Sequence, residues 1–487
     1  MSNKLVLTAY DEQCFAVFIQ QAYGINIHDH QLEKFRDSIS AICLAEGYLG
    51  AQALLQKMIA EPFCAERIKL IENITIDESY FFRDDTQIDF LKYDYLPKLI
   101  EKKRQVGDKQ LRIWSAGCST GQEIYSIAIL LHKLLVDYDS WNLHLLGTDI
   151  SHQSLSRAKH AEYSAWNIRT GQGFISSSGY FQELAEDRFR LSDEIKAKVN
   201  FSYLNLAEDS FPSIMSGTCA LDIILCRNVF IYFDEVAIRR ANSRFSESLN
   251  ENGILMLSAT DPLIIDKDYF IQERKENVFF LRKKSLFFAP ITPPVAESKI
   301  QSVQQSNKQA SGLNLAEAKR LIIKHLSAAE WQIGLNQVNK TLESDVYDAE
   351  LLQFKAKCLI NLGQMSAAQK ACEQSIIQDD VEPHSYLLYG LILMQRGYLS
   401  EAETAFRQTI FLNNAFMEAH YQLGQILLKK GQKKLAIKSI QNALALAALE
   451  KPDRPIHNVI PLTYSSFSGI MKNELELIQH EDSDDRR

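Results

Sequence analysis

Membrane-spanning segments are missing from this sequence of 487 residues. No segment approaches the roughly 18 uninterrupted apolar residues of a membrane helix. The amino terminus, MSNKLVLTAYDEQCF, also has no long apolar run after its lysine, so we expect no signal peptide, no membrane insertion and a cytoplasmic location. The eight cysteines include no C-x-x-C pair. We therefore expect buried free thiols in a reducing compartment and propose no metal site.

An excess of basic residues is also missing. The chain has 53 Lys and Arg against 61 Asp and Glu, a formal net charge of −8. Binding to nucleic acid depends on clustered Lys and Arg that neutralise phosphates, so a nucleic-acid partner is not expected. The content of 46% hydrophobic and 23% charged residues is ordinary for a soluble protein. The length predicts two or three domains.

The most informative segment is LRIWSAGCSTGQEIYSIAI (111–129), followed by LHLLGTDI (143–150). Its pattern predicts a strand ending at Gly117, a glycine turn, a helix beginning near Gln122 and a second strand closed by Asp149. In a doubly wound sheet a carboxylate at that place reaches the two hydroxyls of a ribose. The G-x-G-x-x-G spacing for a pyrophosphate is absent, which favours an adenosine ligand such as S-adenosylmethionine.

Two alternatives remain open for the same segment. GCSTG matches the G-x-S-x-G nucleophile elbow of α/β-hydrolases, with Ser119 as the nucleophile. That interpretation requires an acid and a histidine after later strands and an oxyanion loop. His144, His152 and His160 all lie near the second predicted strand, and no HGGG-like run precedes the elbow. The turn could also be a feature of the sheet that binds no ligand.

Hydrophobic patterning predicts an α/β fold flanked by helical regions. We expect an N-terminal helical domain over 8–85, with one apolar stripe at Phe15, Phe18, Ile19 and Tyr23 and another at Leu54, Leu55 and Met58. A Rossmann-like domain follows over 86–288, with a small inserted subdomain of short strands at about 163–198. Its predicted strands are IWSAG, LHLLGTD, VNFSYLNL, ALDIILC, GILMLSA and NVFFLRKK, and the last is expected as an antiparallel edge strand.

The C-terminal region repeats with a period of 34 residues. A polar, proline-containing linker is expected over 289–312, repeats over 313–450 and a tail over 451–487, whose end HEDSDDRR is expected to be solvated. Small residues recur in three sets: Ala356, Gly390 and Gly424; Gly363, Gly397 and Gly431; Ala368, Ala402 and Ala436. With bulky Leu352, Tyr386 and Phe406, this pattern resembles the tetratricopeptide repeat, with an earlier unit suggested by Ala329 and Gly334. It implies a solenoid that binds a protein partner.

Four motifs in order resemble the CheR-type chemotaxis receptor methyltransferases over about residues 10–284. They are TIDESYFFRD (75–84), expected as a helix start, SAGCSTGQEIYSIA, GTDIS and ILCRNVFIYF (224–233). The resemblance implies a protein-glutamate O-methyltransferase. Such an enzyme uses S-adenosylmethionine to methylate glutamate side chains on the cytoplasmic helices of chemoreceptors.

The resemblance also implies roles for individual residues. The expected cofactor-binding residues are Asp77, Ser79, Arg83, Gly117, Glu123, Asp149, Asn205, Leu206, Arg227 and Asn228. The expected catalytic residues are Arg83, to orient the substrate carboxylate, and Tyr232, to line the methyl channel. Simpler interpretations are a surface salt bridge of Arg83 with Asp84 or Glu78, a core position for Tyr232, and a helix N-cap at Asp77.

The chain departs from the family pattern at two places. Asp77 and Ser79 stand where the family commonly has Asn and Thr. The stretch that corresponds to the family's arginine-rich helix, QLEKFRDSISAICLAEGY, offers only Lys34 and Arg36. A non-catalytic adaptor or sensor that acts through its repeats is therefore an alternative, and a small-molecule O-methyltransferase is another.

Overall fold

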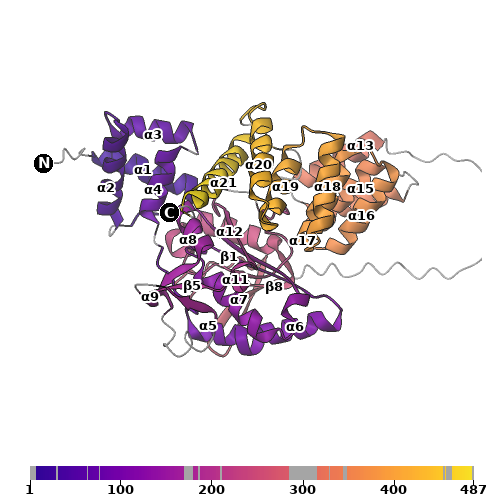
Figure 1. Cartoon of the computed structure of the whole chain (residues 1–487), viewed down its shortest axis with the longest axis horizontal. Coiled ribbons are helices and arrows are strands. Elements are labelled where there is room, and N and C mark those ends of the chain that lie inside the picture. The colour runs from indigo at the N-terminus through magenta and orange to yellow at the C-terminus, as the bar shows by residue number, and fades with distance from the viewer. Residues whose placement is uncertain are drawn as a thin grey trace, which may run out of the picture.

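The structure is a computed structural model. It describes residues 7–28, 31–62, 64–75, 77–168, 179–184, 187–208, 211–284, 315–327, 330–343, 348–452, 454, 456 and 463–484. Figure 1 shows the sheet domain in the lower part of the view, with the N-terminal helices above it at the left and the C-terminal array of paired helices above it at the right. In chain order the fold is therefore α/β between two helical regions, as the sequence predicts.

Four helices form the N-terminal region: α1 (Ala9–Tyr23), α2 (Leu32–Glu46), α3 (Ala51–Ala60) and α4 (Ala65–Ile74). Their shared core contains most of both predicted stripes, and of these residues only Phe18 is partly exposed. Thr8 and Asp11 form a capping box at the start of α1. Gly24 ends the helix at a φ of +68°, where a side chain would strain the backbone.

The segment 75–84, predicted as a helix start, has no helix among its described residues. Phe82 and Asp84 have φ values of 53° and 68°, which no α-helix accommodates. The Phe81 ring instead packs edge-on against Tyr163, with ring centroids 4.9 Å apart. The next helix, α5 (Asp85–Phe90), is capped by the Asp84 carboxylate, which accepts from the Gln87 N–H at 3.2 Å. It leads through a π-helical turn (Leu91–Tyr95) into α6 (Leu96–Gln105).

The central sheet has seven strands in the order β6-β2-β1-β7-β8-β10-β9. They are β1 (Gln110–Ala116), β2 (Asn142–Asp149), β6 (Val199–Tyr203), β7 (Leu221–Leu225), β8 (Leu249–Met256), β9 (Phe270–Lys275) and β10 (Val278–Lys283). The first five in spatial order are parallel, and β10 runs antiparallel to both of its neighbours. The prediction of β10 as the edge strand is wrong, because β9 lies outside it. Among the residues of β9 only Phe270 is buried, so the strand lacks an apolar run.

Helices cover both faces of the sheet. On one face Ile113 and Leu145 share a core with α7 (Gln122–Leu134). On the other, Trp114 and Leu146 pack with α12 (Glu235–Ser248). Neighbouring residues of one strand thus serve opposite cores. The remaining short elements beside the sheet are a 3-10 turn (Tyr138–Ser140), α8 (His152–His160), α9 (Ala165–Ile168), α11 (Asp193–Lys196) and a 3-10 turn (Phe230–Tyr232).

A second, antiparallel sheet follows α8, with the order β3-β5-β4. Its strands are β3 (Glu162–Ser164), β4 (Phe181–Glu183) and β5 (Arg188–Leu191). Short strands therefore occur in the predicted insert at 163–198, although 169–178 lie outside the described residues.

The repeat region forms consecutive helix pairs. They are α13 (Leu315–Ser327) with α14 (Trp331–Leu342), α15 (Ala349–Asn361) with α16 (Met365–Gln378), α17 (Pro383–Gln395) with α18 (Leu399–Leu412), and α19 (Met417–Lys429) with α20 (Lys433–Ala447). A Cβ on Gly390 would lie 2.7 Å from the Phe406 ring, and one on Gly424 would lie 2.6 Å from Ile440. The small residues of the period therefore allow paired helices to approach closely.

The predicted linker (289–312) lies outside the described residues, as does Ala329. The region predicted as a tail from 451 onward instead contains the helix α21 (Tyr464–Asp484). Its Phe467 and Met471 are buried against Met417 and Ile440 of the last repeat. Apolar side chains three and four residues apart explain this packing, which the acidic carboxyl terminus obscures in the sequence. The other predicted domain boundaries stay predictions.

Of the helices in the described ranges, none alone is long and apolar enough to cross a membrane; α2 and α3 meet the criterion only as a pair, bent by 86°. All eight cysteines are free, and all but Cys14 are buried, as the sequence predicts.

Candidate functional site

A cavity lies at the carboxyl ends of four parallel strands, where the N-terminal helices meet the sheet. Ligand sites of open α/β sheets occupy this position. The loops after β1, β2, β6 and β7 and the N-terminal region supply its walls, whose polar or glycine residues include Thr75, Asp77, Gly117, Ser119, Asp149, Asn228 and Tyr232. Leu204, Leu206 and Val229 add apolar surface.

The turn after β1 requires glycine. Gly117 has a φ of +77°, and a Cβ there would lie 2.4 Å from the Val229 side chain. The N–H groups of Gly117 and Cys118 both donate to the Thr148 carbonyl, at 2.8 and 2.9 Å. The turn is thereby fixed to β2, and bare backbone faces the cavity.

Asp149 ends β2 and lines the cavity. Its two oxygens accept from the N–H groups of Ser119 at 2.8 Å and Ser151 at 3.0 Å. Burial nevertheless raises the pKa of Asp149 to about 6, because loss of water disfavours the charged form more than these bonds favour it. Each carboxylate oxygen retains a lone pair for a further donor.

The segment before α5 contributes Asp77. Its carboxylate accepts from the Ser154 hydroxyl at 2.6 Å, and Arg157 lies 3.9 Å from it. Asp77 is not a helix N-cap, because no helix begins among residues 77–84 and Asp84 caps the next helix. The Ser119 hydroxyl donates to the Asp77 carbonyl at 3.1 Å, so Ser119 ties this segment to the glycine turn.

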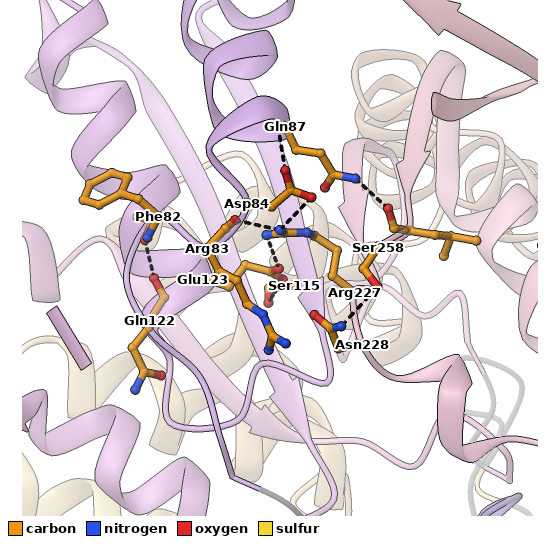
Figure 2. A network of polar contacts seen from close by, with 12 residues as sticks. Phe82, Arg83, Asp84, Gln87, Ser115, Gln122, Glu123, Arg227, Asn228 and Ser258 are labelled. Atoms are coloured by element: carbon orange, nitrogen blue, oxygen red, sulfur yellow. Dashed lines mark hydrogen bonds and ion pairs between the residues drawn. The ribbon is translucent and has the colours of Figure 1, made fainter. Parts of the chain in front are cut away.

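Glu123, on α7, and Arg227, in the loop after β7, form an ion pair (Figure 2). Arg227 Nη1 donates to Glu123 at 3.1 Å and Nη2 donates to the Arg83 carbonyl at 2.6 Å. Ser115 donates to the other Glu123 oxygen at 2.7 Å, and Asp84 lies 3.8 Å from Arg227. The predicted residues Glu123 and Arg227 thus join the chain before α5 to the sheet and do not line the cavity described above.

Arg83 and Tyr232 lie near this network. Figure 2 shows the guanidinium of Arg83 pointing away from that of Arg227. It donates to the Glu78 carbonyl at 3.3 Å and lies over the Tyr80 ring, 5.6 Å from its centroid. Tyr232 lines the cavity, and burial raises the pKa of its hydroxyl while Arg83 opposes this shift.

Two other predicted residues hold chain segments together. Asn205 donates to the Ala22 carbonyl at 2.7 Å and so connects the end of β6 to the N-terminal helices. Ser79 accepts through its carbonyl from Asn167 at 3.1 Å. Neither is among the residues that line the cavity, whereas Leu206 and Asn228 are.

Sequence reasoning missed Asp261, which is buried beside the loop after β7. One of its oxygens accepts from the N–H groups of Asn228 at 2.7 Å and Ser258 at 2.9 Å, and the other accepts from Ile231 at 3.3 Å. Asn228 is held at a φ of +59°. The position of Asp261 before a proline, just after a predicted strand, is the signal that could have identified it.

The sheet order separates this fold from dinucleotide-binding enzymes. Its first five strands follow the Rossmann order, but an antiparallel strand then lies inside the edge. Together with a glycine turn and an acid at the end of β2, this arrangement defines a Rossmann-like, S-adenosylmethionine-dependent methyltransferase as the class of protein.

Comparison with known proteins agrees. The family model described as "CheR methyltransferase, SAM binding domain" matches residues 77–279, and a tetratricopeptide repeat model matches 418–448. The "Probable chemotaxis protein methyltransferase" of Rhizobium etli is 30% identical over 209 residues, 42% of this chain and 75% of that protein. The "Chemotaxis protein methyltransferase" of Borreliella burgdorferi is 29% identical over 242 residues, 50% of this chain and 84% of that protein.

"Chemotaxis protein methyltransferase 1" of Pseudomonas aeruginosa is 28% identical over 260 residues, covering 52% of this chain and 90% of that protein. The chain belongs to the CheR methyltransferase family. Its cofactor is S-adenosylmethionine, and its repeats are of the tetratricopeptide type.

Proposed function

We propose that this protein transfers the methyl group of S-adenosylmethionine to glutamate side chains on the cytoplasmic helices of chemoreceptors. One observation carries the proposal: the cavity is formed largely by the part of the chain that matches the CheR methyltransferase model and proteins named chemotaxis protein methyltransferase. A substrate hydroxyl or amine would require a base to remove its proton. A glutamate carboxylate is already ionised at pH 7 and attacks without one.

We assign the cofactor's parts by chemistry. Asp149 accepts from the ribose hydroxyls, the bare turn at Gly117 allows close approach, and Leu206 packs on the adenine. Asp77 lies toward the sulfonium, whose positive charge a carboxylate stabilises. Asn228 completes the wall on the side of β7.

The remaining predicted cofactor residues receive a supporting role in this proposal. Ser79, Glu123, Asn205 and Arg227 hold the N-terminal segment and the strand ends in place, through the contacts described above. They act on cofactor affinity through the shape of the cavity.

Tyr232 and Arg83 act on the substrate. Transfer needs the sulfur, the methyl carbon and the attacking oxygen nearly in line, and such alignment supplies several kcal/mol of barrier lowering. The Tyr232 hydroxyl orients the attacking oxygen. Arg83 makes a single orienting contact with the substrate carboxylate, since a full bidentate pair would reduce its nucleophilicity.

The few basic residues available for substrate recognition support the alternative that the protein is a non-catalytic adaptor. Of the two basic residues on the predicted recognition stretch, Arg36 donates to Glu12 at 2.6 and 2.8 Å. Its charge is therefore partly balanced within the N-terminal helices. We propose that the repeats compensate by bringing a protein partner or the receptor itself to the enzyme.

The decisive experiment is transfer of a radiolabelled methyl group to purified chemoreceptor cytoplasmic fragments. We expect label that is released as methanol by mild base, which identifies a carboxyl methyl ester. Replacing the receptor's methylatable glutamates with alanine should abolish it, and the Tyr232→Phe enzyme should label more slowly while it retains cofactor binding. An enzyme that binds cofactor but labels no receptor fragment contradicts the glutamate assignment and favours the adaptor.

A further inference from the structure

A second cleft lies between the sheet and the repeat array, away from the cofactor cavity. One wall is the edge strand β6 with neighbouring parts of β2, α8 and α11; the other walls are α19 and α21. Its volume is about 390 Å³, within the range of roughly 300–1,000 Å³ found for small-molecule sites. Ligand sites also occur preferentially at domain interfaces.

The cleft is positively charged. Lys159, Lys196 and Lys429 line it from α8, α11 and α19. Within the described part of the chain none of the three forms an ion pair. The single acidic residue in the described lining, Glu474, already accepts from Tyr421 at 2.9 Å and Gln425 at 2.7 Å. Three lysines without a balancing acid favour an anionic ligand.

The cleft also offers an unused polar group and an apolar wall. The buried hydroxyl oxygen of Ser202, on β6, has no hydrogen-bond partner in the parts of the chain that are described. Such atoms are rare in native proteins. Leu146, Phe467 and Ile470 line the same space, and apolar walls of this kind accept a planar organic group.

We propose that this cleft binds a small organic phosphate of the nucleotide class, with its phosphate among the lysines and its base against the apolar wall. The ammonium group of lysine binds phosphate as a compact point charge. Leu204, at the end of β6, lines both this cleft and the cofactor cavity. The proposal concerns binding alone and does not depend on which substrate is methylated.

The test is calorimetric titration of the full-length protein with GMP, in the presence of saturating S-adenosylhomocysteine to block the cofactor cavity. Guanosine and inorganic phosphate are titrated separately. We expect GMP to bind, guanosine to bind at least about tenfold more weakly, and the double variant Lys159→Gln, Lys429→Gln to lose about tenfold or more in GMP affinity. Lys430→Gln is the matched control, because Lys430 pairs with Glu403 and is absent from the cleft lining.

Unchanged affinity for S-adenosylhomocysteine shows that each variant is folded. The proposal is overturned if GMP does not bind at millimolar concentration, if it binds equally to the double variant, or if a tetraglutamate peptide binds the cleft in its place. If the unmodified protein binds GMP but transfers no methyl group to receptor fragments, the proposed function is contradicted and the GMP site is not.

Discussion

Gln395, the last residue of α17, hydrogen-bonds to the buried guanidinium of Arg112 on β1. Its side-chain oxygen accepts from Arg112 Nη2 at 2.8 Å, and its carbonyl accepts from Nη1 at 3.3 Å. Its side-chain nitrogen donates to the Ile214 carbonyl at 2.7 Å. One glutamine of the repeats thereby satisfies a charged group of the catalytic domain, near the amino end of the sheet.

Replacing Gln395 with alanine should destabilise the protein by about 1 to 3 kcal/mol, because it removes a buried hydrogen bond to a charged group and leaves the donor unpaired. The free energy of unfolding in urea measures the effect. Gln432→Ala, at an exposed position in the turn between α19 and α20, should change it by less than about 0.5 kcal/mol. Equal losses in both variants would mean that Gln395 does not hold the interface.

Gly117→Ala should abolish cofactor binding and cost about 2 to 5 kcal/mol of stability, since it adds backbone strain and a clash with Val229. Gly47 provides the control: it has a φ of +73° but nothing within 4 Å of an added Cβ. Gly47→Ala should therefore show the strain alone, about 1 kcal/mol, with normal affinity for S-adenosylhomocysteine. Binding by Gly117→Ala at normal affinity would place the cofactor elsewhere.

Affinity for S-adenosylhomocysteine should fall as the pH drops through about 6, because the ionised Asp149 accepts from ribose hydroxyls better than the protonated acid does. The same raised pKa has the opposite effect on the free energy of unfolding, which should fall as the pH rises. Between about pH 4 and 6 the folded state holds this proton more tightly than the unfolded chain, so the group's stabilisation is present at acid pH and is lost as the pH rises through 6. Calorimetry from pH 5 to 8 tests the binding, and Asp149→Asn should flatten the profile.

Asp149→Ala should weaken binding of S-adenosylhomocysteine by roughly 1 to 3 kcal/mol at pH 7.5, through the loss of the ribose hydrogen bonds. Unchanged affinity by calorimetry would contradict the placement of the ribose at Asp149.

Asp261→Ala leaves the backbone N–H groups of Asn228, Ser258 and Ile231 without their acceptor. We expect a loss of about 1 to 3 kcal/mol in stability and weaker cofactor binding, since the loop after β7 relaxes. Asp268→Ala, on an exposed residue nearby, should alter neither. If Asp261→Ala lost stability while cofactor affinity stayed normal, Asp261 would not position the cavity wall.

Local patterns in the sequence predicted the elements well wherever one pattern dominates. The strand and turn at Gly117, the acid at Asp149 and the repeat period each depend on residues close together in the chain. The edge strand β9 could not be identified because it is mostly polar, and α21 was hidden by its acidic end. The irregular course of 75–84 depends on a long-range contact, that of Phe81 with Tyr163.

The candidate site shows the same division. Motifs in the sequence identify cavity-lining residues such as Asp77 and Tyr232. The motifs do not distinguish these residues from others that only hold the surrounding segments in place. Glu123 and Arg227 are predicted to bind the cofactor, which stays a prediction; their pairing with each other joins residues 104 positions apart, which local motifs do not report. Asp261 accepts from the Asn228 N–H, 33 residues away in sequence, which no local pattern reports.

The attachment of the repeats through Gln395 lies near the amino ends of the strands, whereas the cofactor cavity lies at their carboxyl ends. In the function proposed above the repeats capture a protein, and α19 of the last repeat lines a cleft that shares Leu204 with the cavity. If that protein carries the substrate, methylation becomes an intramolecular encounter governed by an effective concentration, which depends on the length and stiffness of the tether. Under that proposal a weakly recognised substrate would still be modified efficiently, provided that its tether spans the distance from the repeats to the cavity.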